Sequence, residues 1–352
     1  MLDSEPETPA PGDIAIVSDA WRPQINGVVR VLETLHAKLS ERGHDVEVIG
    51  SDRFRTIPCP TYPEISLAVF PGRRMAKLLE RFSPDAIHIA TEGPLGQAAR
   101  SWCRRHGLPF TTAYHTKFPE YVHARTRLPL AWLYGGMKWF HGPSAGVLAP
   151  SASVYRELAA RGFSNARQWS HGVAADVFQP VGKEFLDLPR PIHLFVGRVA
   201  VEKNLPAFLD LDLPGSKVVV GGGPQRDELI RAYPDVHFLI AQGDAELVRC
   251  FSSADVFVFP SRTDTFGLTM LESLACGVPV AAFPVTGPLD VLGLKGAGET
   301  EFGCLHDDLQ CAIDRALAKS PSACRQHAMA FSWDRVVDEF LANLAPIQRT
   351  GA

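Results

Sequence analysis

The stretch Val256-Phe-Val-Phe-Pro-Ser-Arg-Thr-Asp-Thr-Phe-Gly-Leu-Thr-Met-Leu-Glu-Ser-Leu-Ala-Cys-Gly-Val-Pro-Val-Ala-Ala-Phe283 contains one complete unit of the fold that the sequence predicts. It opens with an apolar run, Val256–Pro260, that has the length of a buried strand, and it continues through a polar loop. Apolar residues then recur at helical spacing over Gly267–Cys276, and Val278–Phe283 is a second apolar run. A strand, a helix and a strand in this order predict two parallel strands joined by a helix on one face of a sheet.

The same alternation of strand and helix runs through the rest of the chain. In the first half, the patterns predict strands at 13–19, 45–50, 86–90, 110–114 and 146–150, and helices at 28–42, 73–82, 95–107 and 152–162. After a linker at 181–191 they predict strands at 192–197, 217–221 and 236–240, and helices at 245–252 and 308–319. The length of 352 residues exceeds what one hydrophobic core usually serves. We therefore predict an α/β fold with two doubly wound halves, whose strands end at a shared ligand cleft.

Composition and charge narrow the class of protein. The chain is 46% hydrophobic and 21% charged, as soluble globular proteins are, which excludes a disordered or fibrous chain. Residues 1–185 hold 21 Lys and Arg against 18 Asp and Glu, whereas residues 186–352 hold 14 against 21. This polarity argues against nucleic acid as a partner and fits a first half that faces something anionic. The sequence has no signal-peptide pattern, so we expect a cytoplasmic protein. A peripheral position on the inner face of the cell membrane stays open.

The loop and helix after Phe259 carry the residue types of a nucleotide site. The first turn of a helix offers free backbone N–H groups, so the backbone around Phe266, Gly267 and Leu268 could bind a diphosphate. Glu272 follows about a turn and a half later, where its carboxylate could accept hydrogen bonds from two ribose hydroxyls. Asp264 lies just outside the helix and could hold hydroxyls beyond the phosphates. Alternatively, the Asp caps the helix and the Glu lies on its solvent face.

The segment Gly197-Arg198-Val-Ala-Val-Glu-Lys203 follows another predicted strand. It presents two cations, Arg198 and Lys203, at the carboxyl end of that strand. A diphosphate leaving group gains negative charge as its bond to the sugar breaks, so paired cations would stabilise the transition state more than the ground state. The alternative is that both are ordinary surface charges.

The stretch from Pro260 to Val280 resembles the E-x7-E signature of the retaining, two-domain (GT-B) nucleotide-sugar glycosyltransferases of family 4, with Asp264 in place of the commoner first Glu. The resemblance covers residues 13–345. It implies two Rossmann-like domains that face a central cleft, with a C-terminal helix that crosses back to the N-terminal domain. The implied division is a disordered tail at 1–12, an acceptor-side domain at 13–182, a nucleotide-sugar domain at 190–325 and a C-terminal helix at 326–352.

The resemblance also assigns roles to the donor-binding residues. It implies that Glu272 holds the ribose, and that Arg198 and Lys203, with the backbone at Phe266–Leu268, grip the diphosphate. In Asn26-Gly27-Val28, the glycine faces the donor phosphate. In Gly221-Gly-Gly-Pro224, Gly223 lies near the nucleotide base, although any tight turn would also need such glycines.

The implied catalytic residues are His115, Asp264, Arg198 and Lys203. His115 of Tyr114-His115-Thr116 contacts the donor sugar near the reacting carbon, and Asp264 holds the donor sugar. The alternative for a lone His at a strand end is a structural hydrogen bond. His171, in a segment that also resembles the family, is open to either role. Family members generally need no metal or cofactor, and we treat the metal-like motif Asp210-Leu-Asp212 as surface.

The acceptor is the least determined part of the prediction. Four cations fall within one short helical segment of the first half: Arg73, Arg74, Lys77 and Arg81. They are accompanied by apolar residues, which suggests a peripheral contact with anionic membrane and a lipid acceptor such as diacylglycerol. A solvated face of an ordinary helix is the alternative. A mannosyltransferase for a polysaccharide or soluble acceptor, a 2-epimerase or phosphorylase of the same fold, and a nucleotide-sugar-binding protein without turnover also stay open.

Overall fold

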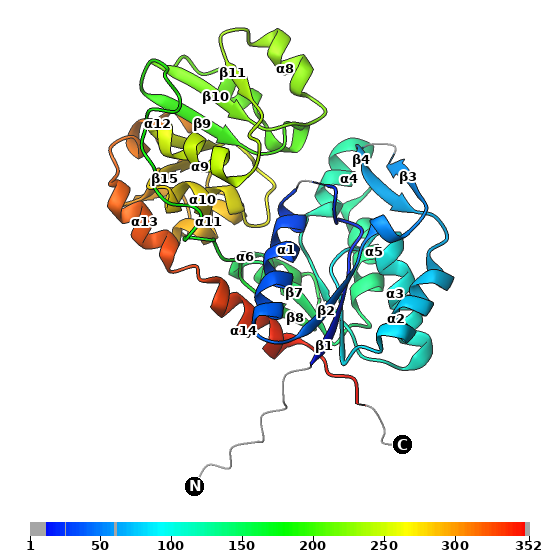
Figure 1. The fold of residues 1–352 in the computed structure, drawn as a ribbon. Coiled ribbons are helices and arrows are strands. Elements are labelled where there is room, and N and C mark those ends of the chain that lie inside the picture. Colours follow the sequence, from blue (N-terminus) through cyan, green and yellow to red (C-terminus); the bar gives the residue numbers. More distant parts are fainter. Residues whose placement is uncertain (1–11, 25, 60–61, 349–352) are drawn as a thin grey trace.

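The computed structural model describes residues 12–24, 26–59 and 62–348, and these form two α/β halves joined by a linker (Figure 1). The predicted tail at 1–12 lies outside the described residues except for Gly12. Each half is built around a sheet of wholly or mainly parallel strands with helices on its two faces, so the predicted fold class is confirmed.

The first sheet has six strands among the described residues, all parallel. In spatial order they are β2 (Asp45–Ile49), β1 (Asp13–Val17), β5 (Ala86–Ile89), β6 (Thr111–Ala113), β7 (Gly146–Ala149) and β8 (Ala166–Gln168). Alternate residues of β1 serve opposite faces, as a strand buried on both sides requires. Ile14 and Ile16 pack in one core cluster, and Ala15 and Val17 pack in another.

Helices cover both faces of this sheet. They are α1 (Gly27–Glu41), α2 (Gly72–Phe82), α3 (Pro94–His106), α4 (Phe118–Thr126), α5 (Leu130–His141) and α6 (Ala152–Ala160), with a short 3₁₀ helix at Ser51–Arg53. A hairpin of β3 (Thr56–Cys59) and β4 (Tyr62–Ala68) precedes α2. The alternation pattern did not predict this hairpin, α4 or α5. Residues 128–150, a long stretch rich in apolar residues, are divided between α5 and β7. No helix among the described residues has the length and apolarity to cross a membrane.

The second sheet has seven strands among the described residues, of which only β14 is antiparallel. In spatial order they are β11 (His237–Leu239), β10 (Ser216–Val220), β9 (Ile192–Val196), β12 (Val256–Phe259), β13 (Val280–Ala282), β15 (Gly303–Leu305) and β14 (Gly298–Thr300). Its helices are η2 (Val201–Lys203), α7 (Pro206–Leu209), α8 (Arg226–Ala232), α9 (Asp244–Ser253), α10 (Leu268–Ala275), α11 (Thr286–Leu292) and α12 (Leu309–Ala316). The sequence patterns did not predict strands β14 and β15.

Two C-terminal helices run from the second half to the first (Figure 1). The first, α13 (Pro321–Met329), packs against α10 through Cys324 and Ala328 in the core of the second half. The second, α14 (Trp333–Asn343), packs against α1 and buries Phe340 in the core of the first half. The indole Nε1 of Trp169 donates a 3.1 Å hydrogen bond to the Val336 carbonyl of α14. The predicted return of the C-terminal helix to the first domain is therefore present.

Candidate active site

Two helices begin opposite each other where the halves meet. Gly267, the N-cap of α10, has a φ of +91°, a conformation that residues with a Cβ rarely adopt, so the backbone favours glycine there. A Cβ on Gly27, at the start of α1, would lie 3.8 Å from Leu268 Cδ1. No side chain among the described residues caps α10, which leaves its first N–H groups for an anion. The geometry therefore brings together the two helix starts that the sequence assigned to the diphosphate.

Glu272 lies in the second turn of α10 and is almost fully buried, with a side chain that is 6% exposed. Its Oε1 is 3.3 Å from Nε of Arg30, whereas its Oε2 is buried with no hydrogen-bond partner among the described residues. Burial raises the pKa of Glu272, and the Arg30 guanidinium opposes that rise. The predicted alternative, a Glu on a solvent face, is wrong. A buried acceptor oxygen without a donor is costly unless a ligand supplies one.

Lys203 and Asp264 form a pair beside this helix. The Lys203 ammonium lies 2.7 and 2.8 Å from the two carboxylate oxygens of Asp264. The η2 segment is tied to the loop before α10, because Asn204 Nδ2 donates to the Pro260 carbonyl at 3.1 Å. Arg198 follows β9 and is half-buried, and this burial lowers the pKa of its guanidinium. The loops after β9 and β12 therefore carry these three charged side chains at the carboxyl end of the second sheet.

Gly223 has a structural reason to be glycine. Its φ is +152°, and a Cβ built on it would lie 2.3 Å from the Val199 carbonyl oxygen. Gly221 likewise has a φ of +145° and would meet the Gly197 carbonyl at 2.0 Å. The two glycines let this loop run directly against the backbone around Arg198. The predicted contact of Gly223 with the base stays a prediction.

His115 lies just beyond β6, at the boundary between the halves. Its ring is stacked on that of His171, with centroids 6.0 Å apart, and its Nε2 is buried with no hydrogen-bond partner among the described residues. Burial lowers the pKa of His115 well below its ordinary value and lowers that of His171 to about 4, so both rings are neutral at neutral pH. Thr265 Oγ1 donates to the His115 carbonyl at 2.8 Å, and Phe266 packs on His171. The His and the loop before α10 are thus brought together.

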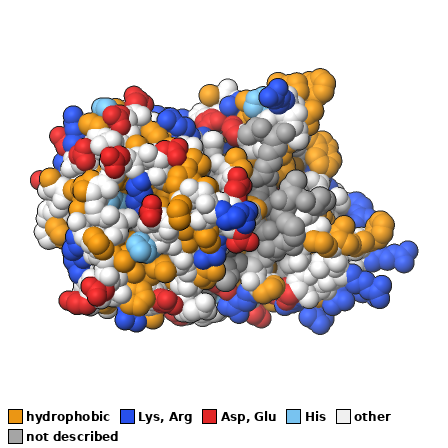
Figure 2. Space-filling model, turned by 90° about the horizontal axis from the view of Figure 1, so that it is seen from above, with side chains coloured by type: hydrophobic (Ala, Val, Ile, Leu, Met, Phe, Trp, Pro, Cys, Tyr) orange, Lys and Arg blue, Asp and Glu red, His pale blue; other side chains and the backbone are white. Residues whose placement is uncertain are grey.

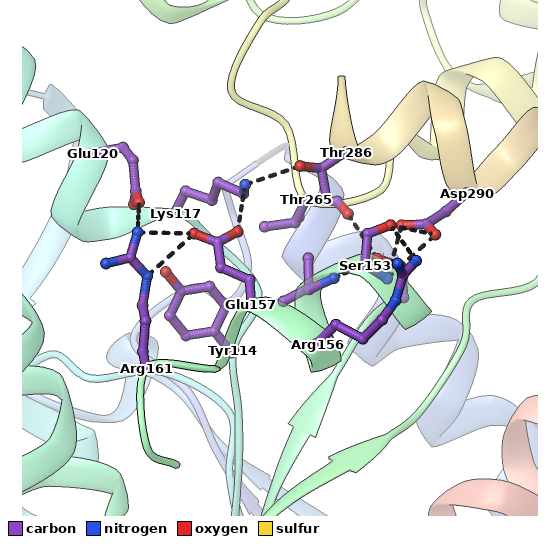
Figure 3. A network of polar contacts seen from close by, with 12 residues as sticks. Tyr114, Lys117, Glu120, Ser153, Arg156, Glu157, Arg161, Thr265, Thr286 and Asp290 are labelled. Carbon is purple, nitrogen blue, oxygen red and sulfur yellow. Dashed lines mark hydrogen bonds and ion pairs between the residues drawn. The ribbon is translucent and has the colours of Figure 1, made fainter. Parts of the chain in front are cut away.

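Polar contacts hold the halves together beside the site (Figure 3). Lys117 is nearly buried, and its ammonium lies 2.8 Å from Glu157 of α6 and 3.1 Å from the Thr286 hydroxyl of α11. Ser153 Oγ donates to Asp290 of α11 at 2.9 Å, and the backbone N–H of Ser153 points to the same carboxylate. The described residues therefore bridge the boundary with charged groups that belong to both sequence halves.

Sequence reasoning did not select Arg30 or Lys117. A signal for Arg30 was present: it stands in the first turn of α1, where the helix dipole disfavours a cation, so an outside partner was to be expected. Lys117 follows Tyr114-His115-Thr116 and carried no such signal. No group of three or more His, Cys, Asp or Glu within the described ranges could hold a metal ion. Asp210 and Asp212 of the metal-like motif are exposed, and Asp210 accepts a 2.6 Å hydrogen bond from the hydroxyl of Tyr233, the C-cap of α8.

Comparison with known proteins finds matches over both halves. Residues 25–177 match the family model described as Glycosyltransferase Family 4, and residues 181–331 match Glycosyl transferases group 1. A GDP-mannose-dependent alpha-mannosyltransferase of Corynebacterium glutamicum is 30% identical over 81% of this chain and 76% of its own. An alpha-monoglucosyldiacylglycerol synthase of Streptococcus pneumoniae is 27% identical over 88% of this chain and 79% of its own. The structure of a sucrose-phosphate synthase of Thermosynechococcus elongatus aligns with a TM-score of 0.73 at 21% identity, covering 93% of this chain and 97% of that one.

Proposed function

The chain belongs to the family 4 glycosyltransferases of the GT-B fold, and on that premise we propose that it moves a hexosyl group from a UDP- or GDP-sugar to a hydroxyl of a membrane lipid such as diacylglycerol, with retention of the anomeric configuration. The observation that carries the donor assignment is Glu272 Oε2, on the helix that begins opposite α1: this oxygen is buried and has no hydrogen-bond donor within the described part of the chain. Two ribose hydroxyls supply the donors that this oxygen lacks.

The diphosphate is proposed to lie at the N-terminus of α10, opposite Gly27. The N–H groups around Gly267 and Leu268 face it there, and Arg198 and Lys203 offset its charge. Because these cations can neutralise the leaving group, we expect no metal to take part. Asp264 orients Lys203 and holds a hydroxyl of the donor sugar.

The transfer step is proposed to occur on one face of the sugar. The acceptor oxygen forms a bond to the anomeric carbon while the bond from that carbon to the diphosphate breaks, and a diphosphate oxygen takes the proton of the acceptor hydroxyl. The neutral His115 ring donates or accepts one hydrogen bond to the donor sugar through its buried Nε2. Since its pKa is far below 7, its role does not change with pH across the neutral range.

The lipid acceptor is proposed from the outer face of the first half. The basic α2 patch, defined as Arg73, Arg74, Lys77 and Arg81, is exposed, although Arg81 also lies 3.7 Å from Glu47. Met75 and Leu79 of α2 are fully buried in the core, and Ala76, Leu78 and Phe82 are partly buried against it. The amphipathic helix predicted from the sequence therefore offers charge to a membrane, and its apolar side packs in the protein.

Exposed aromatic rings elsewhere on the first half supply the apolar part of the proposed membrane contact. Phe70, two residues before α2, is 95% exposed and has a φ of +47°, a left-handed conformation that a bulky residue adopts at a cost. Trp132 and Trp139 are exposed one above the other on α5, at a spacing of two helical turns. Figure 2 shows orange and blue side chains next to each other at the right-hand edge, on the first half. Aromatic rings beside cations suit the interface of an anionic bilayer.

The proposed acceptor is tested by incubating UDP-glucose, GDP-mannose and other nucleotide sugars with diacylglycerol in anionic vesicles or with soluble glycans. Mass spectrometry of the products is expected to find the hexosyl group on the lipid, with one nucleoside diphosphate released for each transfer. A hexosylated soluble glycan without glycolipid would contradict the lipid acceptor. Conversion of the donor to its C2 epimer without any acceptor would contradict the transfer itself.

Charge reversal in the basic α2 patch is expected to weaken vesicle binding. Each cation near an anionic surface contributes about 1 kcal/mol, so Arg73→Glu/Arg74→Glu should lower binding more than about tenfold at low salt. The effect should shrink as salt shortens the screening length below about 10 Å. Vesicle flotation measures the change in binding. The control is Arg231→Glu/Arg315→Glu, which reverses two exposed cations of the second half and changes the net charge by the same amount. Equal flotation of wild type and both variants, or none by wild type, would contradict membrane contact.

A further inference from the structure

Arg30 reaches from the first half of the chain into the proposed ribose site of the second. Its Nε lies 3.3 Å from Glu272 Oε1, and its guanidinium also forms an ion pair with Asp244 of α9. The guanidinium carbon lies 5.1 Å from the ring centroid of Phe178, which packs in the core of the second half. Arg30 itself belongs to the first turn of α1. A side chain of α1 is therefore in contact with three residues that lie in or pack on the second half.

The contact with Arg30 affects the protonation of Glu272, together with the other charged groups around it. Burial raises the pKa of Glu272, and Asp244, from α9, raises it further. Arg30, from α1, lowers the pKa of Glu272. The thiol of Cys276, the C-cap of α10, is a second titratable group nearby, and Glu272 contributes to the rise of its pKa. Arg30 is thus the nearby cation that favours the carboxylate over the carboxylic acid. It occupies Oε1 and leaves Oε2 for other donors.

We propose that Arg30 is a positioning residue for the donor: it holds the Glu272 carboxylate so that Oε2 accepts the ribose hydroxyls, and it makes the ribose site complete only when the two halves are together. The inference rests on the proposed function, since it assigns the ribose to Glu272. If the halves move apart, Glu272 loses its cation and binds ribose less well. By linkage, a bound donor then favours the joined state by the same factor.

Donor affinity across the acid and neutral range tests this inference. GDP-mannose and UDP-glucose are suitable ligands for calorimetry, because they lack the phosphate monoester whose second pKa is about 6. The carboxylate is the binding form, so affinity is lost as the pH falls through the pKa of Glu272. Arg30→Met removes the cation and should move this loss upward by about one pH unit or more. At neutral pH it should weaken binding about tenfold, as an increase in donor KM with a smaller change in kcat.

Three further variants separate positioning from a general loss of structure. Arg30→Lys keeps the charge, so the acid-side loss should stay near its wild-type pH. Arg42→Met is the matched control, because Arg42 is the C-cap of the same helix, has a side chain of similar exposure and pairs with Asp338 of α14. It should leave donor binding unchanged. If Arg30→Met does not fold, Asp244→Asn replaces it, and the acid-side loss should then move to lower pH, since Asp244 raises the pKa of Glu272.

Three outcomes would overturn the inference, and only the last of them also overturns the proposed function. If wild type binds a nucleotide sugar but Arg30→Met has the affinity and pH dependence of Arg42→Met, Arg30 has no positioning role and the proposed function is untouched. With an unfolded Arg30→Met protein, an unchanged pH dependence in Asp244→Asn would overturn it in the same way. If wild type binds neither nucleotide sugar at any pH, the proposed function and this inference fail together.

Discussion

Replacing Glu272 by Ala is expected to abolish most sugar transfer while the fold remains intact. The variant loses two hydrogen bonds from ribose to a charged acceptor, each of which contributes about 1.5 to 3 kcal/mol. The specificity constant kcat/KM for the donor should therefore fall at least about 100-fold. Steady-state kinetics with the preferred donor and acceptor measures the loss. The fold is expected to tolerate the change, because Arg30, which pairs with Glu272 Oε1, keeps its ion pair with Asp244.

Glu272→Gln is the control of equal shape for this prediction. Its amide oxygen can still accept one hydrogen bond, but it has no charge to strengthen that bond, so activity should lie between wild type and Glu272→Ala. Thermal unfolding of the three proteins shows whether the fold is kept. A well-folded Glu272→Ala protein with near wild-type kcat/KM would remove the ribose assignment.

Removing the cations Arg198 and Lys203 is expected to lower kcat by more than it raises the donor KM. The negative charge of the diphosphate grows as its bond to the sugar breaks, so a cation there stabilises the transition state above the ground state. Loss of one preorganised group of this kind typically costs about 100- to 1,000-fold in kcat. Kinetics of Arg198→Ala and Lys203→Ala, together with the affinity of each for UDP and GDP, separates the two effects.

The pairing of Lys203 with Asp264 requires a second variant. Lys203→Ala leaves the Asp264 carboxylate without the ammonium that lies 2.7 Å from it, and that anion would repel the diphosphate. Lys203→Ala/Asp264→Asn removes this repulsion and isolates the effect of the lost cation. Arg198→Lys should restore only part of the activity, since a point charge replaces a planar fork. If nucleotide binding and turnover weakened equally, the cations would act in ground-state binding alone.

Much of the fold was predictable because its signals are local. Apolar runs of strand length, such as that ending at Phe259, alternate with helical periodicity, and this pattern specifies parallel sheets with helices on both faces. The start of α10 was predictable for the same reason, since a glycine after a strand and before a periodic segment indicates where backbone N–H groups are free. The hairpin at 56–68 escaped, because prolines at 58 and 63 interrupt its alternation.

The contacts between the halves were not predictable from the sequence. Arg30 and Glu272 are more than 240 positions apart in the sequence, and no local pattern specifies which charged residues meet across a domain boundary. The pairing of Lys203 with Asp264 and the contact of Lys117 with Thr286 depend in the same way on how loops approach after folding. The sequence could indicate the residue types of a donor site, and the partners of each side chain required the fold.

A crystal structure with an unreactive nucleotide-sugar analogue tests the central claim most directly. We expect ribose hydroxyls on Glu272 Oε2, the diphosphate at the start of α10 within reach of Arg198 and Lys203, and the sugar facing Asp264. A nucleotide bound elsewhere, for example in the polar groove along β2 that Trp21, His36 and Glu47 line, would contradict it. So would a bound nucleotide that leaves Glu272 in contact with Arg30 alone.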